Sequence, residues 1–132
     1  MRLPGASIIF FNSSGQVLLV LRDNIPSIPY PGVWDLPGGH LEEGESAEEC
    51  IVREMLEEME INVEGCRLFQ IYEFSDRREY VFMLQANFEP DEIDLHEGEM
   101  IRWFTKSEAE ALELAYGFNT VVRDFFETRQ RK

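Results

Sequence analysis

The sequence predicts an α+β domain in which helices cover a mixed β-sheet. Runs rich in β-branched and aromatic residues alternate with turn signals, an acidic helical segment interrupts them, and two helical segments follow near the end of the chain. The chain has 132 residues, of which 44% are hydrophobic, so one core can form without disulfides. We therefore expect a single domain over residues 1–132.

The strands are predicted from their composition and from the turns that bound them. Residues 12–15 are a hairpin signal, and residues 75–78 form a second turn. Residues 23–32 hold three prolines and predict a stiff loop. The expected strands are residues 6–11, 16–22, 33–36, 63–74, 79–88 and 100–105.

A helix is predicted to begin at Ser46, because Ser46 and Glu49 form the pattern of a capping box. On a helical wheel one arc carries the apolar residues and a roughly opposite arc carries three glutamates. The apolar arc comprises Ile51, Val52, Met55, Leu56 and Met59, and the acidic arc comprises Glu54, Glu57 and Glu58.

Two further helices are expected near the C-terminal end. Residues 107–114 begin with a second Ser-x-x-Glu pattern, formed by Ser107 and Glu110. Residues 118–129 carry apolar side chains at helical spacing. The cations Arg129, Arg131 and Lys132 would complement the negative C-terminal end of that last helix.

The acidic arc indicates a cation site. Like charges three and four residues apart destabilise a helix, and Arg53 is the only cation between Ser46 and Met59. Hard carboxylate oxygens suit Mg²⁺ or Mn²⁺. A solvated acidic face is the alternative, but Gly38 and Gly39 lie just upstream and allow the backbone to approach an ion or phosphate closely.

The spacing of these residues resembles the Nudix box of Nudix hydrolases. Gly39 is followed after five residues by Glu45 and after seven more by the run Arg53-Glu54-Met55-Leu56-Glu57-Glu58-Met59-Glu60-Ile61. One fixed position departs from the pattern, since Glu60 stands where the family has Gly. Either Glu60 adopts the left-handed conformation at a cost of about 1 kcal/mol, or the helix continues towards Asn62 or Gly65.

The resemblance implies a Nudix α/β/α sandwich and a set of site residues. The Gly39 carbonyl and the carboxylates of Glu54, Glu57 and Glu58 would hold divalent metal, Mg²⁺ or alternatively Mn²⁺. Arg53 would orient one of these carboxylates, and Glu45 would support the loop. A further Glu often reaches this site in the family, and Glu99 fits that place best, with Glu97 second.

Several other residues are candidates for substrate binding. Arg22 could meet a phosphate or form an ion pair, and Tyr30 and Trp34 could stack on a base or pack in the core. Asn119 could read a base edge, as a comparable Asn does in relatives acting on oxidised purine nucleotides, or cap a helix. Arg77 and Arg78 could steer a polyphosphate.

Composition limits the partners and the location. With 12 basic and 26 acidic residues, the net charge of −14 disfavours a nucleic-acid polymer as partner, while a small anion bound through metal remains compatible. No apolar run is long enough to span a membrane, and residues 1–4 do not resemble a signal peptide. Cys50 and Cys66 look reduced, which suits the cytoplasm, and Cys50 fits a packed position better than a ligand role. The sequence leaves a homodimer open.

The resemblance implies Mg²⁺-dependent hydrolysis of a nucleoside diphosphate-linked substrate. The favoured activity is that of a MutT-like pyrophosphohydrolase, which cleaves a nucleoside triphosphate, including oxidised purine nucleotides, to the monophosphate and pyrophosphate. Dinucleoside polyphosphates and nucleotide sugars are alternative substrates. The resemblance disfavours ADP-ribose, because relatives that act on it often carry a Pro a short distance after the box. No Pro occurs in this chain between Pro37 and Pro90. A nucleotide-sensing domain without catalysis is the alternative from another class.

Overall fold

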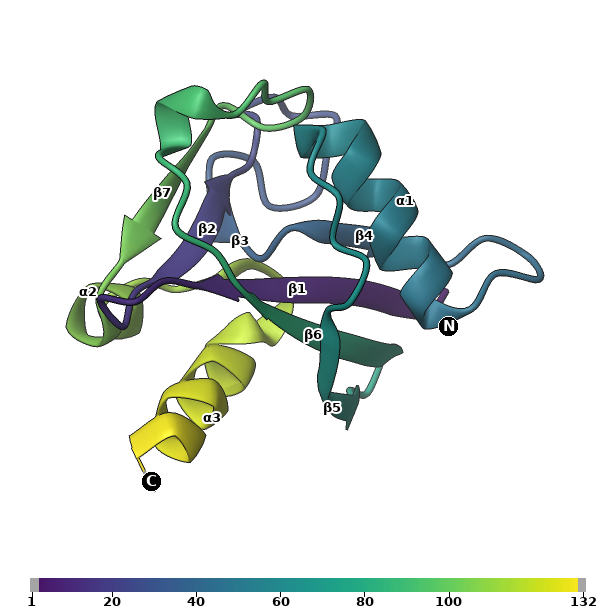
Figure 1. The fold of residues 1–132 in the computed structure, drawn as a ribbon. Helices are drawn as coiled ribbons and strands as arrows, with labels where there is room; N and C mark the ends of the chain where they lie inside the picture. Colours follow the sequence, from purple (N-terminus) through teal and green to yellow (C-terminus); the bar gives the residue numbers. More distant parts are fainter. Residues whose placement is uncertain (1–2, 131–132) are drawn as a thin grey trace.

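The structure is a computed structural model that describes residues 3–130, so Arg131 and Lys132 lie outside it (Figure 1). Among the described residues, no helix has the length and apolar character needed to cross a bilayer. The chain forms the elements β1 Gly5–Phe11, β2 Val17–Leu21, β3 Trp34–Asp35, β4 Gly38–His40, α1 Ala47–Met59, β5 Arg67–Glu73, β6 Arg78–Gln85, η1 Pro90–Glu92, β7 Met100–Phe104, α2 Lys106–Glu110, η2 Ala115–Gly117 and α3 Phe118–Gln130.

The strands join in one seven-stranded mixed sheet, as predicted. Its main order is β3-β2-β1-β6-β5, and in addition β4 pairs with β1 and β7 pairs with β2. The β1 and β6 strands are parallel over seven residue pairs, whereas the other pairings are antiparallel. The β1 strand lies in the middle of this sheet, and apart from Ser7 its residues from Ala6 to Phe11 are apolar.

Helices cover both faces of the sheet and give the expected sandwich. Figure 1 shows α1 on one side of β1 and α3 on the other. Successive side chains of β1 point to opposite faces, so Ile8 and Phe10 pack with Ile51 and Met55 of α1, while Ile9 packs with Phe125 of α3 in a second cluster. The layers predicted by the resemblance are confirmed.

The helix α1 is rotated relative to the predicted apolar arc. The Ser46 capping box is present, but Leu56 is 49% exposed, and Cys50 and Glu58 are buried instead. The buried face of the helix therefore includes one member of the acidic arc. This rotation turns Glu58 towards the interior, and it explains why Cys50 is packed, as expected.

The C-terminal end of α1 shows which of the two conformations expected at Glu60 is present. The helix ends at Met59, and Glu60 takes the left-handed conformation with φ 56° and ψ 34°. Its amide donates to the carbonyls of Met55 and Leu56, so the glycine-type helix end is preserved with a side chain in the glycine position. The chain then runs without regular structure to β5, which begins at Arg67 rather than at residue 63.

The helix α2 begins at Lys106, one residue before its predicted start, and its N-cap is Thr105 rather than Ser107. Thr105 directly follows β7 and is the N-cap, since its hydroxyl accepts from the Glu108 amide at 3.2 Å and the Glu108 carboxylate accepts from the Thr105 amide at 2.8 Å. The prediction that Ser107 and Glu110 form the capping box was therefore wrong. The helix also ends earlier, at Glu110.

Candidate active site

The site begins where β4 delivers Gly39 to the edge of α1. Gly39 pairs with Ala6 of β1, and a Cβ atom added to Gly39 would lie only 1.8 Å from Oε2 of Glu54. The absence of a side chain therefore allows the Glu54 carboxylate to lie directly against the Gly39 backbone. Gly39 and Glu54, which the spacing of the box assigned to one site, are therefore adjacent in the structure.

Arg53 connects the loop before α1 to the acidic face. Its guanidinium binds Glu45 through two contacts, Nε to Oε2 at 2.7 Å and Nη2 to Oε1 at 3.0 Å. Its Nη1 atom reaches Glu54 at 3.3 Å and Glu57 at 3.2 Å. The hydrogen bonds from Arg53 lower the pKa of Glu45 to about 2. Arg53 thus contacts the loop through Glu45 and reaches two of the three helix carboxylates, whereas the resemblance implied that it orients one of them.

The three carboxylates of α1 differ in burial. The Glu57 side chain is 57% exposed and pairs with Arg53, whereas the Glu54 side chain is 16% exposed. Glu58 is buried, and its Oε2 atom has no hydrogen-bond partner among the described residues. Burial, reinforced by the neighbouring carboxylates of Glu97 and Glu54, raises the pKa of Glu58 to about 9.

The extra carboxylate at this cluster comes from Glu97 rather than Glu99. Glu97 lines the same cleft as Gly39 and Glu54, and its negative charge raises the pKa of both Glu54 and Glu58. Glu99 faces elsewhere, because its Oε1 atom accepts from the Asn24 amide at 3.0 Å. The structure therefore reverses the order in which the sequence ranked these two glutamates.

This arrangement of oxygen atoms suits a divalent cation. A buried carboxylate without a partner is costly, and three glutamates in one place repel one another, unless a positive charge compensates them. Hard oxygen donors match Mg²⁺ and Mn²⁺. Glu58 is the buried member of this carboxylate cluster, Glu54 is half-buried beside Gly39, and Glu97 and Glu57 are exposed.

A cleft of about 440 Å³ opens beside the carboxylate cluster. Glu54, Glu97 and Gly39 are among the residues that line it, together with a second group of aromatic and charged side chains. The box identified Gly39 and Glu54, the resemblance ranked Glu97 second to Glu99, and the sequence missed most of the second group. The second group comprises Arg22, Asp35, Arg77, Tyr116 and Phe118.

Arg22 lies in the cleft, but it is already paired. Its Nη1 atom binds Oδ2 of Asp35 at 3.0 Å, and its Nε atom donates to the Pro29 carbonyl at 2.9 Å. Burial raises the pKa of Asp35 to about 6, although Arg22 opposes the shift. Oδ1 of Asp35 has no hydrogen-bond partner among the described residues. The ion-pair interpretation of Arg22 is confirmed, with Asp35 as the acid, and a contact between Arg22 and a phosphate stays a prediction.

A buried polar network forms another part of the cleft wall. Arg77 binds Glu79 at 2.8 Å, and the second oxygen of Glu79 accepts from the Ser7 hydroxyl at 2.8 Å. Arg78 is different, since it is exposed and pairs with Glu73 across the hairpin. The sequence carried only part of the signal for this network, because Ser7 lies between apolar residues of β1 whereas Glu79 follows Arg78 at the start of β6.

The remaining predicted substrate-binding residues do not line this cleft. Trp34 packs against Phe104 at 4.8 Å in the core, which is the alternative considered for it. Tyr30 is 45% exposed, and its ring contacts that of Tyr116 at 4.6 Å. The Asn119 side chain is used locally, since it donates to the Leu112 carbonyl and accepts from the Leu114 amide. Asn119 therefore links the first turn of α3 to the segment that precedes the helix.

Comparisons with known proteins agree with this geometry. The family model described as NUDIX domain matches residues 1–125. A putative 8-oxo-dGTP diphosphatase of Bacillus subtilis is 41% identical over 85 residues, which are 62% of this chain and 53% of the relative. An ADP-ribose pyrophosphatase of Methanocaldococcus jannaschii is 30% identical over 116 residues, or 83% of this chain and 65% of the relative. The matches thus span about half to two thirds of these curated relatives.

A solved structure reported for MutT from Aliivibrio salmonicida and Vibrio cholerae has the same architecture. It superposes with a TM-score of 0.79 at 25% identity, covering 97% of this chain and 99% of that chain. The family match extends over nearly the whole chain and includes the box, the sheet and the cleft. On this evidence, the chain belongs to the Nudix family.

Proposed function

We propose that this protein is a Mg²⁺-dependent hydrolase of nucleoside diphosphate-linked substrates. The favoured reaction converts a nucleoside triphosphate, including oxidised purine forms, to the monophosphate and pyrophosphate. The observation that carries the proposal is the buried Glu58, whose unpartnered oxygen lies in a cluster with Glu54 and Glu97 at one part of a cleft. Such a cluster is suited to holding divalent cations against an anionic substrate.

The proposed roles follow from the contacts. Gly39, Glu54, Glu58 and Glu97 hold the cations, with Glu57 at the rim, while Arg53 keeps Glu54 and Glu57 in place. When bound, the cations supply charge that neutralises the phosphates and lowers the pKa of water. A carboxylate of the cluster accepts a proton as water attacks phosphorus, and the phosphoanhydride bond breaks to release pyrophosphate.

The cleft also indicates how a nucleotide is oriented. The two arginines away from the carboxylate cluster are neutralised by acids, Arg22 by Asp35 and Arg77 by Glu79, so this region offers little net positive charge to a phosphate. Tyr116 and Phe118 add aromatic surface there. We therefore place the phosphates at the carboxylate cluster and the nucleoside near the aromatic rings.

Two substrate classes are supported by the relatives. The 8-oxo-dGTP diphosphatase of Bacillus subtilis and the MutT structure favour a nucleoside triphosphate. The archaeal ADP-ribose pyrophosphatase, whose match covers 83% of this chain, makes ADP-ribose the second candidate. The absence of a Pro after the box concerns one position, whereas the match to this relative extends over most of the chain, so ADP-ribose stays a candidate.

A nucleotide panel tests the proposal. Purified protein is incubated with Mg²⁺, or with Mn²⁺ in its place, and with dGTP, 8-oxo-dGTP, ADP-ribose or a diadenosine polyphosphate, and the products are separated by ion exchange. We expect monophosphate and pyrophosphate from a triphosphate, with Glu58→Gln reducing the rate at least about 100-fold. The exposed Glu64→Gln is the matched control and should retain the rate. Binding of a nucleotide without turnover of any would instead support the sensor.

A further inference from the structure

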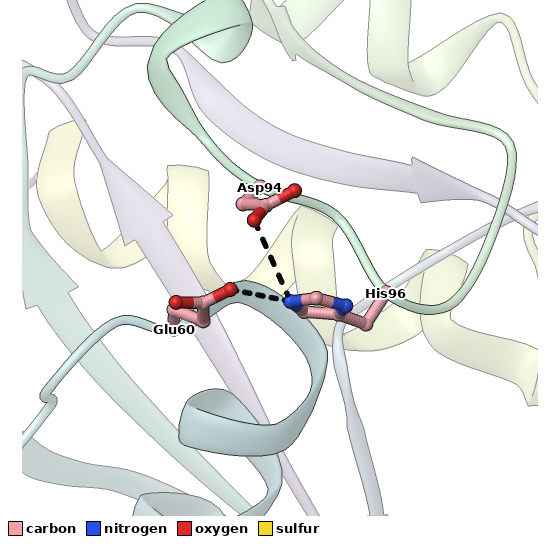
Figure 2. A group of neighbouring side chains, drawn as sticks. All are labelled: Glu60, Asp94 and His96. Atoms are coloured by element: carbon pink, nitrogen blue, oxygen red, sulfur yellow. Dashed lines mark hydrogen bonds and ion pairs between the residues drawn. The ribbon is translucent and has the colours of Figure 1, made fainter.

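Glu60 is joined to the loop that follows β6 and η1. Figure 2 shows the Glu60 carboxylate at the end of α1, with His96 and Asp94 approaching it from this loop. Nε2 of His96 forms a hydrogen bond with Oε2 of Glu60, and Oδ2 of Asp94 lies 3.8 Å from the same nitrogen. The imidazole thus lies between carboxylates from two separate segments of the chain.

The backbone of His96 makes a second attachment to α1. Its amide donates to the Glu58 carbonyl at 2.7 Å, so both the main chain and the side chain of His96 bind the last turn of the helix. Further along, the Glu99 amide donates to the Leu21 carbonyl at 2.8 Å. Glu97 lies between these two attachments, immediately after His96, and it lines the cleft with Glu54.

The residue at position 60 is unusual for its backbone conformation. Its φ of 56° is one that glycine adopts without penalty and that a residue with a Cβ adopts at a cost in stability. Glycine is also the residue expected there from the Nudix box. The glutamate therefore gives up some helix-end stability, and its side chain bonds to His96 with Asp94 close by.

We propose that Glu60 and His96 form a clasp that positions Glu97 in the carboxylate cluster. Glu60 and His96 are positioning residues in this account, and Asp94 adds negative charge beside the imidazole. The inference rests on the proposed function, which gives Glu97 its role in cation binding. The clasp is a feature of this chain, because it needs the side chain at position 60 that replaces glycine.

The test is Mn²⁺ binding to the full chain, measured by the electron paramagnetic resonance signal of free Mn²⁺ in the absence of nucleotide. His96→Ala and Glu60→Gly should each weaken Mn²⁺ affinity about tenfold, as should Glu97→Gln. Adding His96→Ala to Glu97→Gln should cause no further loss, because both changes remove the same contribution. Lys106→Ala, which removes an exposed ion pair with Glu110, is the matched control and should retain wild-type affinity.

Two further measurements separate positioning from general stability. Glu60→Gly removes the left-handed strain, so its thermal midpoint should stay near that of the wild type while Mn²⁺ affinity falls. His96→Gln, which can still donate to Glu60, should restore part of the affinity lost in His96→Ala.

Three results would overturn the clasp. The first is wild-type Mn²⁺ affinity in His96→Ala, and the second is a full additional loss when His96→Ala is combined with Glu97→Gln. The third is the loss of one bound Mn²⁺ in Glu60→Gly while the carboxylate cluster binds a second Mn²⁺ with wild-type affinity. That result would mean that Glu60, Asp94 and His96 bind an ion themselves. Failure of the wild type to bind Mn²⁺ at all would instead overturn the proposed function and the clasp with it.

Discussion

Individual residues at the site are held in conditions that are unfavourable without a ligand. Glu58 is a buried carboxylate with one oxygen that has no hydrogen-bond partner among the described residues, and Glu54 lies where a Cβ atom on Gly39 would clash with its carboxylate. Burial raises the pKa of both carboxylates. These costs are local, and a cation bound between the carboxylates, as proposed above, would offset them.

The contact between Gly39 and Glu54 predicts a variant that folds but loses function. In Gly39→Ala the new Cβ atom would meet the end of the flexible Glu54 side chain at 1.8 Å, so the carboxylate must move while the fold persists. We expect about a 100-fold loss in turnover and a change in thermal midpoint of only a few degrees. Steady-state hydrolysis and calorimetry check these values.

Gly44→Ala, in the loop between β4 and α1, is the matched control. Gly44 has φ 78° with open space around it, so the substitution strains the backbone without displacing a site residue. It should cost about 1 kcal/mol in unfolding free energy and leave turnover close to wild type. Equal turnover losses in both variants would contradict the structural distinction between these glycines.

The elements show how far the sequence determines the fold. Ser46 and Glu49 placed the start of α1 correctly, since a capping box is a local interaction. The rotation of α1 was not predictable from the pattern of the helix alone. Leu56 is exposed and Glu58 is buried, the reverse of what the pattern predicts, because of how the helix packs against the sheet and β4. The box residues followed from spacing, whereas choosing Glu97 over Glu99 required the path of a loop held by contacts distant in sequence.

The N-cap of α2 can be tested directly, because two overlapping patterns compete. Thr105→Ala removes a hydroxyl that accepts from the Glu108 amide and should lower the unfolding free energy by about 1 kcal/mol. Ser107→Ala should change it by less than about 0.5 kcal/mol, since Ser107 is already inside the helix. Urea denaturation compares the two, and a larger effect at Ser107 would mean that the helix begins where the sequence pattern first suggested.

On the scale of the whole molecule, the sandwich brings distant segments to one cleft. The mixed sheet presents Ser7 and Glu79 from adjacent parallel strands, β3 adds Asp35, and α1 and the loop after η1 add the carboxylates. The order of the elements predicted helices over a mixed sheet, and the resemblance predicted the sandwich. The polar residues that complete the cleft were not recognised, because each is isolated in the sequence and they meet only through strand pairing.

The most direct test of the cation site is the stability of the whole protein as a function of pH. Without metal, the pKa of Glu58 is raised in the folded state to about 9 from a usual value of 4.5, so the native state holds a proton that the unfolded state has released. The unfolding free energy should therefore fall as pH rises between these values, by up to about 1.4 kcal/mol per pH unit from this residue. Mg²⁺ should reverse the fall, because it binds the deprotonated carboxylates of the native state.

The comparison with Glu58→Gln isolates this residue, since Asp35 and His96 titrate in both proteins. Urea unfolding from pH 6 to 9, in chelator and in Mg²⁺, should show a smaller fall with pH in the variant and a much smaller gain from Mg²⁺ than in the wild type. Parallel pH profiles for the two proteins, with no stabilisation of the wild type by Mg²⁺, would contradict a cation site built on Glu58.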